Sequence, residues 1–259
     1  MRMDFFSEDR HSVVSPREMV LAFMPSAGGL SKDLPLERLA LITFTTHDLH
    51  GFLGEGGQGR QIKSWRKRAR TIHKREGWIV VQSPYGAPGT VMLLEELAAF
   101  GVRRAIFVGY CGSIQDWVKI GGIVLPVEAI REEGTSYHYL PKGEKSCPDT
   151  TLQSRLSNWL LACGLSCYAG RIWTTDAPYR ETVEKVRRYG NAGVLGVEME
   201  MAAAFAFGSA RGISIGAVLL VSDEVREGGW RTGFFSPELK AARERVIRIL
   251  IRRIEELIP

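Results

Sequence analysis

The feature that most constrains the fold of this chain is the alternation of short, uniformly apolar segments with longer amphipathic ones. Segments 39–45, 78–82, 104–109 and 213–221 are apolar at nearly every position, which indicates strands buried on both faces. The intervening segments place apolar residues at helical spacing, as in the helix expected at 90–100. We therefore predict an α/β fold with a mainly parallel or mixed, twisted central sheet flanked by helices on both faces.

Capping residues set further boundaries. Asp149 is predicted to cap a helix that runs to about Cys163, and Ser236-Pro237 opens a long C-terminal helix. Because no repeat, low-complexity stretch or linker divides the chain, we interpret residues 1–259 as a single domain with a divergent N-terminal segment, 1–34. Further strands are expected at 121–130, 168–174 and 194–197, and further helices at 179–189 and 200–211.

The composition narrows the classes of protein to which the chain can belong. It is 45% hydrophobic and 24% charged, which is typical of globular proteins. No apolar run reaches the roughly 18 residues of a membrane span, and the N-terminus lacks a secretory pattern, so we expect a cytoplasmic protein that binds no membrane. The four cysteines, among them Cys163 and Cys167, form no zinc-type cluster, and we interpret them as free thiols without a metal.

Much of the net charge of +5 is concentrated in the basic segment GRQIKSWRKRARTIHKR, residues 59–75. We interpret it as a solvated helix face rather than a nucleic-acid site, because it has one tryptophan and no DNA- or RNA-binding motif around it. A third interpretation, in which one of its arginines reaches an anionic substrate, stays open.

Residues with useful chemistry follow several of the predicted strands, where ligands collect in such folds. Asp223, in the expected loop Ser222-Asp223-Glu224, can supply a proton or a hydrogen bond; a turn or helix cap is the alternative. Glu198 and Glu200, separated by Met199, suit a sugar diol with the methionine as an apolar wall; an acidic first helical turn is the alternative.

A third such segment, GYCGSIQ at 109–115, is predicted to be a glycine-bounded loop whose backbone amides can line an anion or base site. It is neither a Walker loop nor a dinucleotide fingerprint, because it lacks their glycine spacing and the Gly-Lys-Ser/Thr sequence.

Five segments in a fixed order add more specific information: GAPGTVMLLEELAAFGVRRAIFVGYCGSIQ, IVLPVEAIREEGTSYHYLP, TTDAPYRET, GVEMEMAAAFAFGSARG and VSDE. With them the sequence resembles the nucleoside phosphorylase superfamily, which includes purine nucleoside phosphorylases, uridine phosphorylases and methylthioadenosine nucleosidases. The resemblance covers roughly residues 77–231.

The resemblance implies a role for each of these residues. Glu200 is expected to hold the ribose 2′ and 3′ hydroxyls, with Met199 against the sugar and Glu198 nearby. Asp223 corresponds to the acid that protonates or hydrogen-bonds a purine at N7. The residues expected in the base pocket are Tyr110, Cys111, Gly112 and Ser222.

The resemblance breaks down at the phosphate site. The Gly-Asp-Pro-x-Arg loop of phosphorylases is replaced by Thr43-Phe-Thr-Thr-His-Asp48, their second phosphate arginine by Phe107, and a hydroxyl residue by Tyr110. Each lost charge-assisted hydrogen bond removes about 1.5–3 kcal/mol, so phosphate should bind poorly unless an arginine of the basic segment compensates. The candidate phosphate contacts are Gly86, Arg60 and Arg68, with Arg66 and Arg70 as alternative arginines.

The preferred hypothesis is a nucleoside phosphorylase-type glycosyltransferase of purine salvage, which uses phosphate as co-substrate, needs no cofactor, and releases a free base and (deoxy)ribose 1-phosphate. A nucleosidase that uses water, or a catalytically silent nucleoside-binding protein, is the alternative. Asp223 favours a purine, although EEGTSYHYLP and TTDAPYRET look closer to uridine phosphorylase-like relatives. We expect a homodimer or hexamer, because family members complete each site with residues from a neighbouring subunit.

Overall fold

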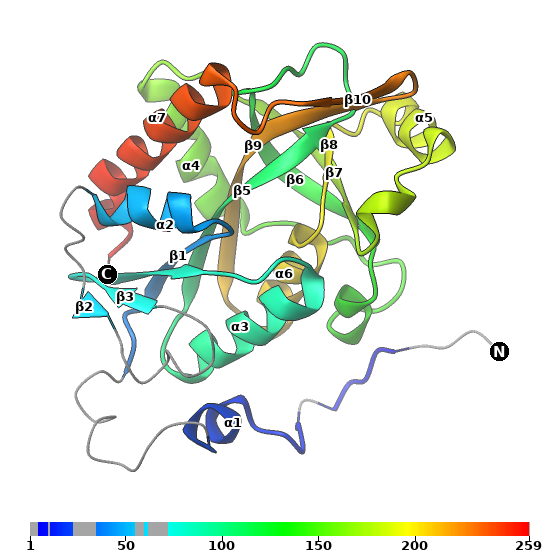
Figure 1. The fold of residues 1–259 in the computed structure, drawn as a ribbon. Helices are drawn as coiled ribbons and strands as arrows, with labels where there is room; N and C mark the ends of the chain where they lie inside the picture. Colours follow the sequence, from blue (N-terminus) through cyan, green and yellow to red (C-terminus); the bar gives the residue numbers. More distant parts are fainter. Residues whose placement is uncertain (1–4, 10, 23–34, 55–59, 62–71, 259) are drawn as a thin grey trace.

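The computed structural model describes residues 5–9, 11–22, 35–54, 60–61 and 72–258, and its strands form one ten-stranded mixed sheet (Figure 1). The strands are β1 (Leu39–Thr43), β2 (Arg60–Gln61), β3 (Ile72–Lys74), β4 (Trp78–Gln82), β5 (Arg104–Ser113), β6 (Ile123–Glu132), β7 (Tyr168–Thr175), β8 (Gly196–Glu198), β9 (Ser214–Arg226) and β10 (Gly229–Thr232). The α-helices are α1 (Pro16–Ala22), α2 (Thr46–Leu53), α3 (Ala87–Ala99), α4 (Thr150–Ala162), α5 (Val183–Asn191), α6 (Met201–Arg211) and α7 (Pro237–Arg253). Short 3-10 helices are η2 (Thr135–His138), η3 (Pro178–Arg180) and η4 (Ile254–Leu257).

Five strands of the sheet close into a ring. β5 pairs in parallel with β9, and β9 pairs antiparallel with β6. β7 lies parallel between β6 and β8, and β8 returns antiparallel to β5. Outside the ring, the sheet continues from β5 through β1, β4, β3 and β2. The predicted α/β fold with a mixed central sheet is confirmed, and the ring is a feature that the apolar pattern did not predict.

Helices cover both faces of the sheet (Figure 1). Leu39 and Leu41 of β1 pack in a cluster with residues of α2, α4 and α7, whereas Ala40 and Ile42 pack in a cluster with residues of α3 and α6. Successive side chains of a strand point to opposite faces, so an uninterrupted apolar strand supplies both clusters. The short helix α1 packs against α3.

Helix starts agree well with the capping signals. The side chain of Asp149 accepts a hydrogen bond from the N–H of Leu152 at 2.7 Å, and that of Ser236 accepts one from Leu239 at 3.1 Å. The helix predicted from residue 179 instead begins at Val183, because the Pro178–Arg180 segment forms the 3-10 helix η3. Helix α2 and strand β10 were not predicted.

All four cysteines are free thiols, as predicted. Of the helices in the described part of the chain, none combines the length and the apolar character that crossing a membrane requires.

Candidate active site

A cavity of about 740 Å³ opens where the parallel strands β5 and β9 reach their carboxyl ends. This is the edge of the sheet at which a ligand was expected. Strands β5, β8 and β9 and the start of α6 bring the predicted ribose, base and acid residues into its wall: Tyr110, Cys111, Gly112, Glu198, Met199, Glu200, Ser222 and Asp223.

Two segments predicted as loops are strands instead. Residues 109–113 belong to β5 and residues 222–226 to β9, because the two strands stay paired beyond their apolar parts, with Gly112 opposite Asp223. The register shifts between Cys111 and Gly112, which leaves Ser222 as the extra residue of a β-bulge. Bulges often redirect side chains beside active sites. Asp223 is therefore held by paired strand rather than by a loop.

The carboxylate of Asp223 is fixed from both sides. The Ser222 hydroxyl donates to Oδ1 at 2.6 Å, and the Trp230 indole N–H donates to Oδ2 at 2.7 Å. Gly112 gives the carboxylate room, because a Cβ there would lie 2.9 Å from Oδ2. Trp230 is a site residue that sequence reasoning missed, since β10 was not predicted. The aspartate is only 9% exposed and lines the cavity.

The carboxylate of Glu198 is engaged in hydrogen bonds within the protein. One of its oxygens accepts a hydrogen bond from the Thr174 hydroxyl, and Oε2 accepts the N–H groups of Glu200 and Met201, each at 2.7 Å. These bonds satisfy amides at the start of α6, as a carboxylate near a helix N-terminus should. Of the two interpretations of Glu198, the geometry favours a residue that positions the helix start next to the cavity.

Glu200 lies at the N-cap of α6 and lines the cavity beside Met199. Its Oε1 accepts the N–H of Gly86 at 2.6 Å. The amide of Gly86 thus donates within the protein, and its expected contact with phosphate stays a prediction. Burial raises the pKa of the Glu200 carboxyl, opposed by hydrogen bonds from the backbone of Gly86 and Met199. Glu200 offers the cavity a buried, well-positioned hydrogen-bonding group, which suits a sugar hydroxyl.

Tyr110 connects the cavity to a buried acid. Its hydroxyl donates to both carboxylate oxygens of Asp48, at 2.7 and 2.9 Å, and the Thr45 hydroxyl donates to the same group at 2.6 Å. Arg243 of α7 pairs with Asp48 at 3.8 Å. Burial, followed by the charge of Asp48, raises the pKa of Tyr110. Nothing in the local sequence indicated Arg243, which lies far along the chain from Asp48.

Aromatic residues fill the place of the second phosphate arginine. Phe107 is fully buried, with its ring 6.0 Å from that of Phe44, which lines the cavity. Tyr85 stacks on Phe44 at 6.1 Å. Burial, then the charges of Asp48 and Glu200, raises the pKa of Tyr85.

Glu181 is a second site residue that the sequence did not reveal. It lines the cavity, and burial, with a smaller contribution from Asp223, raises its pKa to about 7. Cys111 is fully buried, and its pKa is raised by burial and then by the charges of Asp223 and Glu198, so its thiol stays protonated.

The arginines proposed to compensate for the missing phosphate loop cannot be placed in the cavity. Arg66, Arg68 and Arg70 lie outside the described residues, and of Arg60 only the backbone is described, paired with Lys74 in the β2–β3 hairpin. Within the described ranges, no group of three or more His, Cys, Asp and Glu side chains has the arrangement of a metal site.

A model of the phosphorylase superfamily matches residues 38–255. Guanosine phosphorylase from Halorubrum lacusprofundi is 30% identical over 176 residues, which cover 66% of this chain and 73% of that protein. A DeoD-type purine nucleoside phosphorylase from Bacillus cereus is 31% identical over 146 residues, which cover 55% of this chain and 62% of that protein.

Solved structures with the same fold include AMP nucleosidase from Bacteroides thetaiotaomicron, with a TM-score of 0.72 and 25% identity over 94% of this chain and 100% of that one. Purine nucleoside phosphorylase from Toxoplasma gondii, in complex with immucillin-H, has a TM-score of 0.76 over 86% of this chain and 92% of that one. At 20% identity, the second likeness is one of fold alone.

Proposed function

Because the chain belongs to the phosphorylase superfamily, a family of enzymes, we propose that it cleaves the N-glycosidic bond of a purine ribonucleoside with water as the nucleophile. The reaction releases the free base and ribose. Of the four similar proteins, three are named phosphorylases and one is named a nucleosidase. The choice between phosphate and water therefore rests on this chain's own residues.

The observation that carries the proposal is the Tyr110–Asp48 contact. In the segment that replaces the phosphate loop of phosphorylases, this chain has a fully buried carboxylate, Asp48, which accepts the Tyr110 hydroxyl and is already paired with Arg243. A carboxylate next to a phosphate is repulsive, and the repulsion grows in a poorly solvated site. Water has no charge to repel, and a tyrosine hydroxyl at the cavity wall can hold it by hydrogen bonding.

The other residues then take complementary roles. Asp223, held by Ser222 and Trp230, stabilises the departing base by a proton or a hydrogen bond at N7. Glu200 binds the ribose diol, and Glu198 fixes the helix start on which Glu200 sits. Holding the sugar next to the nucleophile makes a bimolecular reaction effectively unimolecular, and this provides part of the rate enhancement.

Phosphorolysis is the second candidate, and the names of the guanosine and purine nucleoside phosphorylase relatives favour it. It requires an arginine from the basic segment, in this subunit or a neighbouring one, to reach the cavity. Mutating that arginine to alanine would then weaken phosphate without weakening the nucleoside.

We also propose that the enzyme is a homodimer or hexamer working in cytoplasmic purine salvage without a cofactor. Tyr179, which is fully exposed, and Trp230, which is 61% exposed, leave apolar surface at the cavity mouth. A neighbouring subunit would cover this surface. Light scattering tests the oligomer, and an active monomer would contradict it.

The reaction is tested with purified protein and a panel of purine and pyrimidine nucleosides, with and without phosphate, in water enriched in oxygen-18. We expect ribose carrying the heavy oxygen at C1, at a rate that phosphate leaves unchanged. Ribose 1-phosphate formed with a saturable dependence on phosphate would replace this proposal with phosphorolysis. Nucleoside binding without any cleavage would indicate a silent binding protein.

A further inference from the structure

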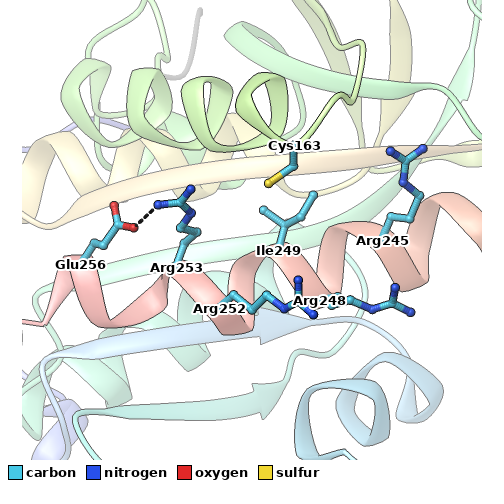
Figure 2. A pocket seen from close by; sticks show the side chains of 7 residues that line it. All are labelled: Cys163, Arg245, Arg248, Ile249, Arg252, Arg253 and Glu256. Atoms are coloured by element: carbon cyan, nitrogen blue, oxygen red, sulfur yellow. Dashed lines mark hydrogen bonds and ion pairs between the residues drawn. The ribbon is translucent and has the colours of Figure 1, made fainter.

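Helix α7 carries an arginine ridge, Arg245, Arg248 and Arg252, that lies outside the active-site cavity. The spacings of three and four residues place the three side chains on one face of the helix, where all three are exposed. Figure 2 shows them along α7, with Cys163 at the end of α4 facing the same helix.

The ridge lies between two concave surfaces. A cavity of about 490 Å³ between α7 and Cys163 is lined by all three arginines of the ridge. A second cavity, of about 680 Å³, lies between α7 and α2, and Arg248 and Arg252 line it together with His47 and His50. A ligand on the ridge can therefore contact the walls of both cavities as well as the face of the helix.

The charges of the ridge are not neutralised by the described residues. Arg253 pairs with Glu256 at 2.8 Å and Arg243 with Asp48 at 3.8 Å, but no carboxylate in the described ranges pairs with the ridge arginines, and Glu244 only lines the second cavity. Like charges three and four residues apart on a helix destabilise it. An anion that bridges them removes this repulsion.

We propose that the arginine ridge binds a small polyphosphate anion, at a site separate from the nucleoside cavity. Guanidinium groups match phosphate oxygens with paired, parallel hydrogen bonds. From Arg245 to Arg252 the helix rises about 10 Å, which suits two or three linked phosphates better than one.

The surroundings argue against larger anionic partners. A helix that lies on a membrane presents apolar residues beside its cations, whereas Ile247 and Ile249 of α7 are buried. Single-stranded nucleic acid binds through aromatic side chains on which bases stack, and neither cavity is lined by a phenylalanine, tyrosine or tryptophan.

The test measures binding of tripolyphosphate by calorimetry at physiological salt, with no catalytic readout, so that it stands apart from the proposed reaction. We expect saturable one-to-one binding that weakens about tenfold or more in the double variant Arg248→Gln/Arg252→Gln. The matched control is Arg187→Gln/Arg188→Gln, an exposed pair on α5 with the same charge change, which should leave the affinity unchanged. Circular dichroism checks that both variants fold.

Four results would overturn the proposal. The first is no saturable binding to the wild-type protein, and the second is an equal loss in both double variants, which indicates diffuse attraction. The third is displacement of tripolyphosphate by saturating nucleoside, which places the anion in the nucleoside cavity. The fourth is tighter binding of an RNA oligonucleotide or of phosphatidylserine vesicles through the same arginines.

Discussion

The two ends of the active-site cavity, one proposed to hold the base and sugar and the other the nucleophile, are built in opposite ways. At the base and sugar end, Asp223 and Glu200 are each held by a few neighbours and line the open space. At the other end, Tyr110 of the cavity wall donates to Asp48, and Asp48 pairs with Arg243, so the arginine's charge is used within the protein. The first end can accept a ligand as it stands, whereas the second offers it little free positive charge.

The difference follows from where the residues come from. The base and sugar end is built on strands of the ring and on the start of α6, whereas Asp48 and Arg243 come from α2 and α7, which lie outside the ring.

The largest effect is expected at the base end. Asp223→Asn should leave the fold intact but slow purine nucleoside cleavage on the order of 10²-fold or more, the scale of a lost general acid. Steady-state kinetics with a purine ribonucleoside measures it. Trp230→Phe, which removes only the indole N–H that donates to Asp223, should cost clearly less. An unchanged rate in the asparagine variant would remove the catalytic role of Asp223.

At the other end of the cavity, we expect a substitution to affect mainly the free energy of unfolding. Asp48→Ala leaves the Tyr110 hydroxyl and Arg243 without their buried partner, so we expect a loss of about 2–3 kcal/mol in the free energy of unfolding. Urea denaturation measures this loss. Asp48→Asn keeps an acceptor for the hydroxyl and should lose less. A loss of less than about 0.5 kcal/mol in the alanine variant would mean that this network is not a unit.

Within the proposed sugar site, substitutions of Glu200 and Glu198 should have different effects on a ribonucleoside and its 2′-deoxy analogue. Glu200→Ala should reduce kcat/KM for a ribonucleoside about tenfold more than for its 2′-deoxy analogue, because only the first loses a hydroxyl partner. Glu198→Gln keeps an acceptor for the helix-start amides and should affect both substrates alike. Equal losses on both substrates in the Glu200 variant would argue against diol binding.

The smallest effect concerns pH. Burial raises the pKa of Glu181 from an ordinary 4.5 to about 7, so the folded protein binds the proton more tightly than the unfolded chain. Stability from this group is present at low pH and falls as the pH rises from about 4.5 to 7. Glu181→Gln should therefore raise Tm more at pH 8 than at pH 5.

The matched control is Glu184→Gln, which makes the same chemical change at an exposed carboxyl of α5. A shift in the Glu181 variant that does not depend on pH would mean that its carboxyl titrates normally.

Much of the base and sugar end could be predicted from sequence. Glu198, Met199, Glu200 and Asp223 lie in short contiguous motifs beside strands, so local pattern and family resemblance both pointed to them. The secondary structure around these residues was predicted less well. Glycine and acidic residues after residue 109 and after residue 221 end the apolar runs, which suggested loops, yet β5 and β9 continue because they pair with each other.

The contacts of the opposite end could not be predicted. Asp48 and Tyr110 are 62 residues apart, and Arg243 lies on a third element, so no local pattern links them. Trp230 is on a hairpin strand of only four residues, too short to give a periodic signal. In each case the two partners are brought together by tertiary packing between elements distant in sequence or by a short hairpin, which a single sequence does not reveal.

The closure of the ring also has a consequence for the order in which this protein folds. β5 pairs with β9 from Arg104 opposite Ser214 onward, so the pairing that places Gly112 beside Asp223 joins parts of the chain more than a hundred residues apart. Contacts of such long range are slow to form, because a large loop must close before any of them is gained. During synthesis, the edge of β5 must wait for β9 to emerge from the ribosome. A newly made molecule should therefore become active only late in folding. Until then, the unpaired edge of β5 exposes it to aggregation.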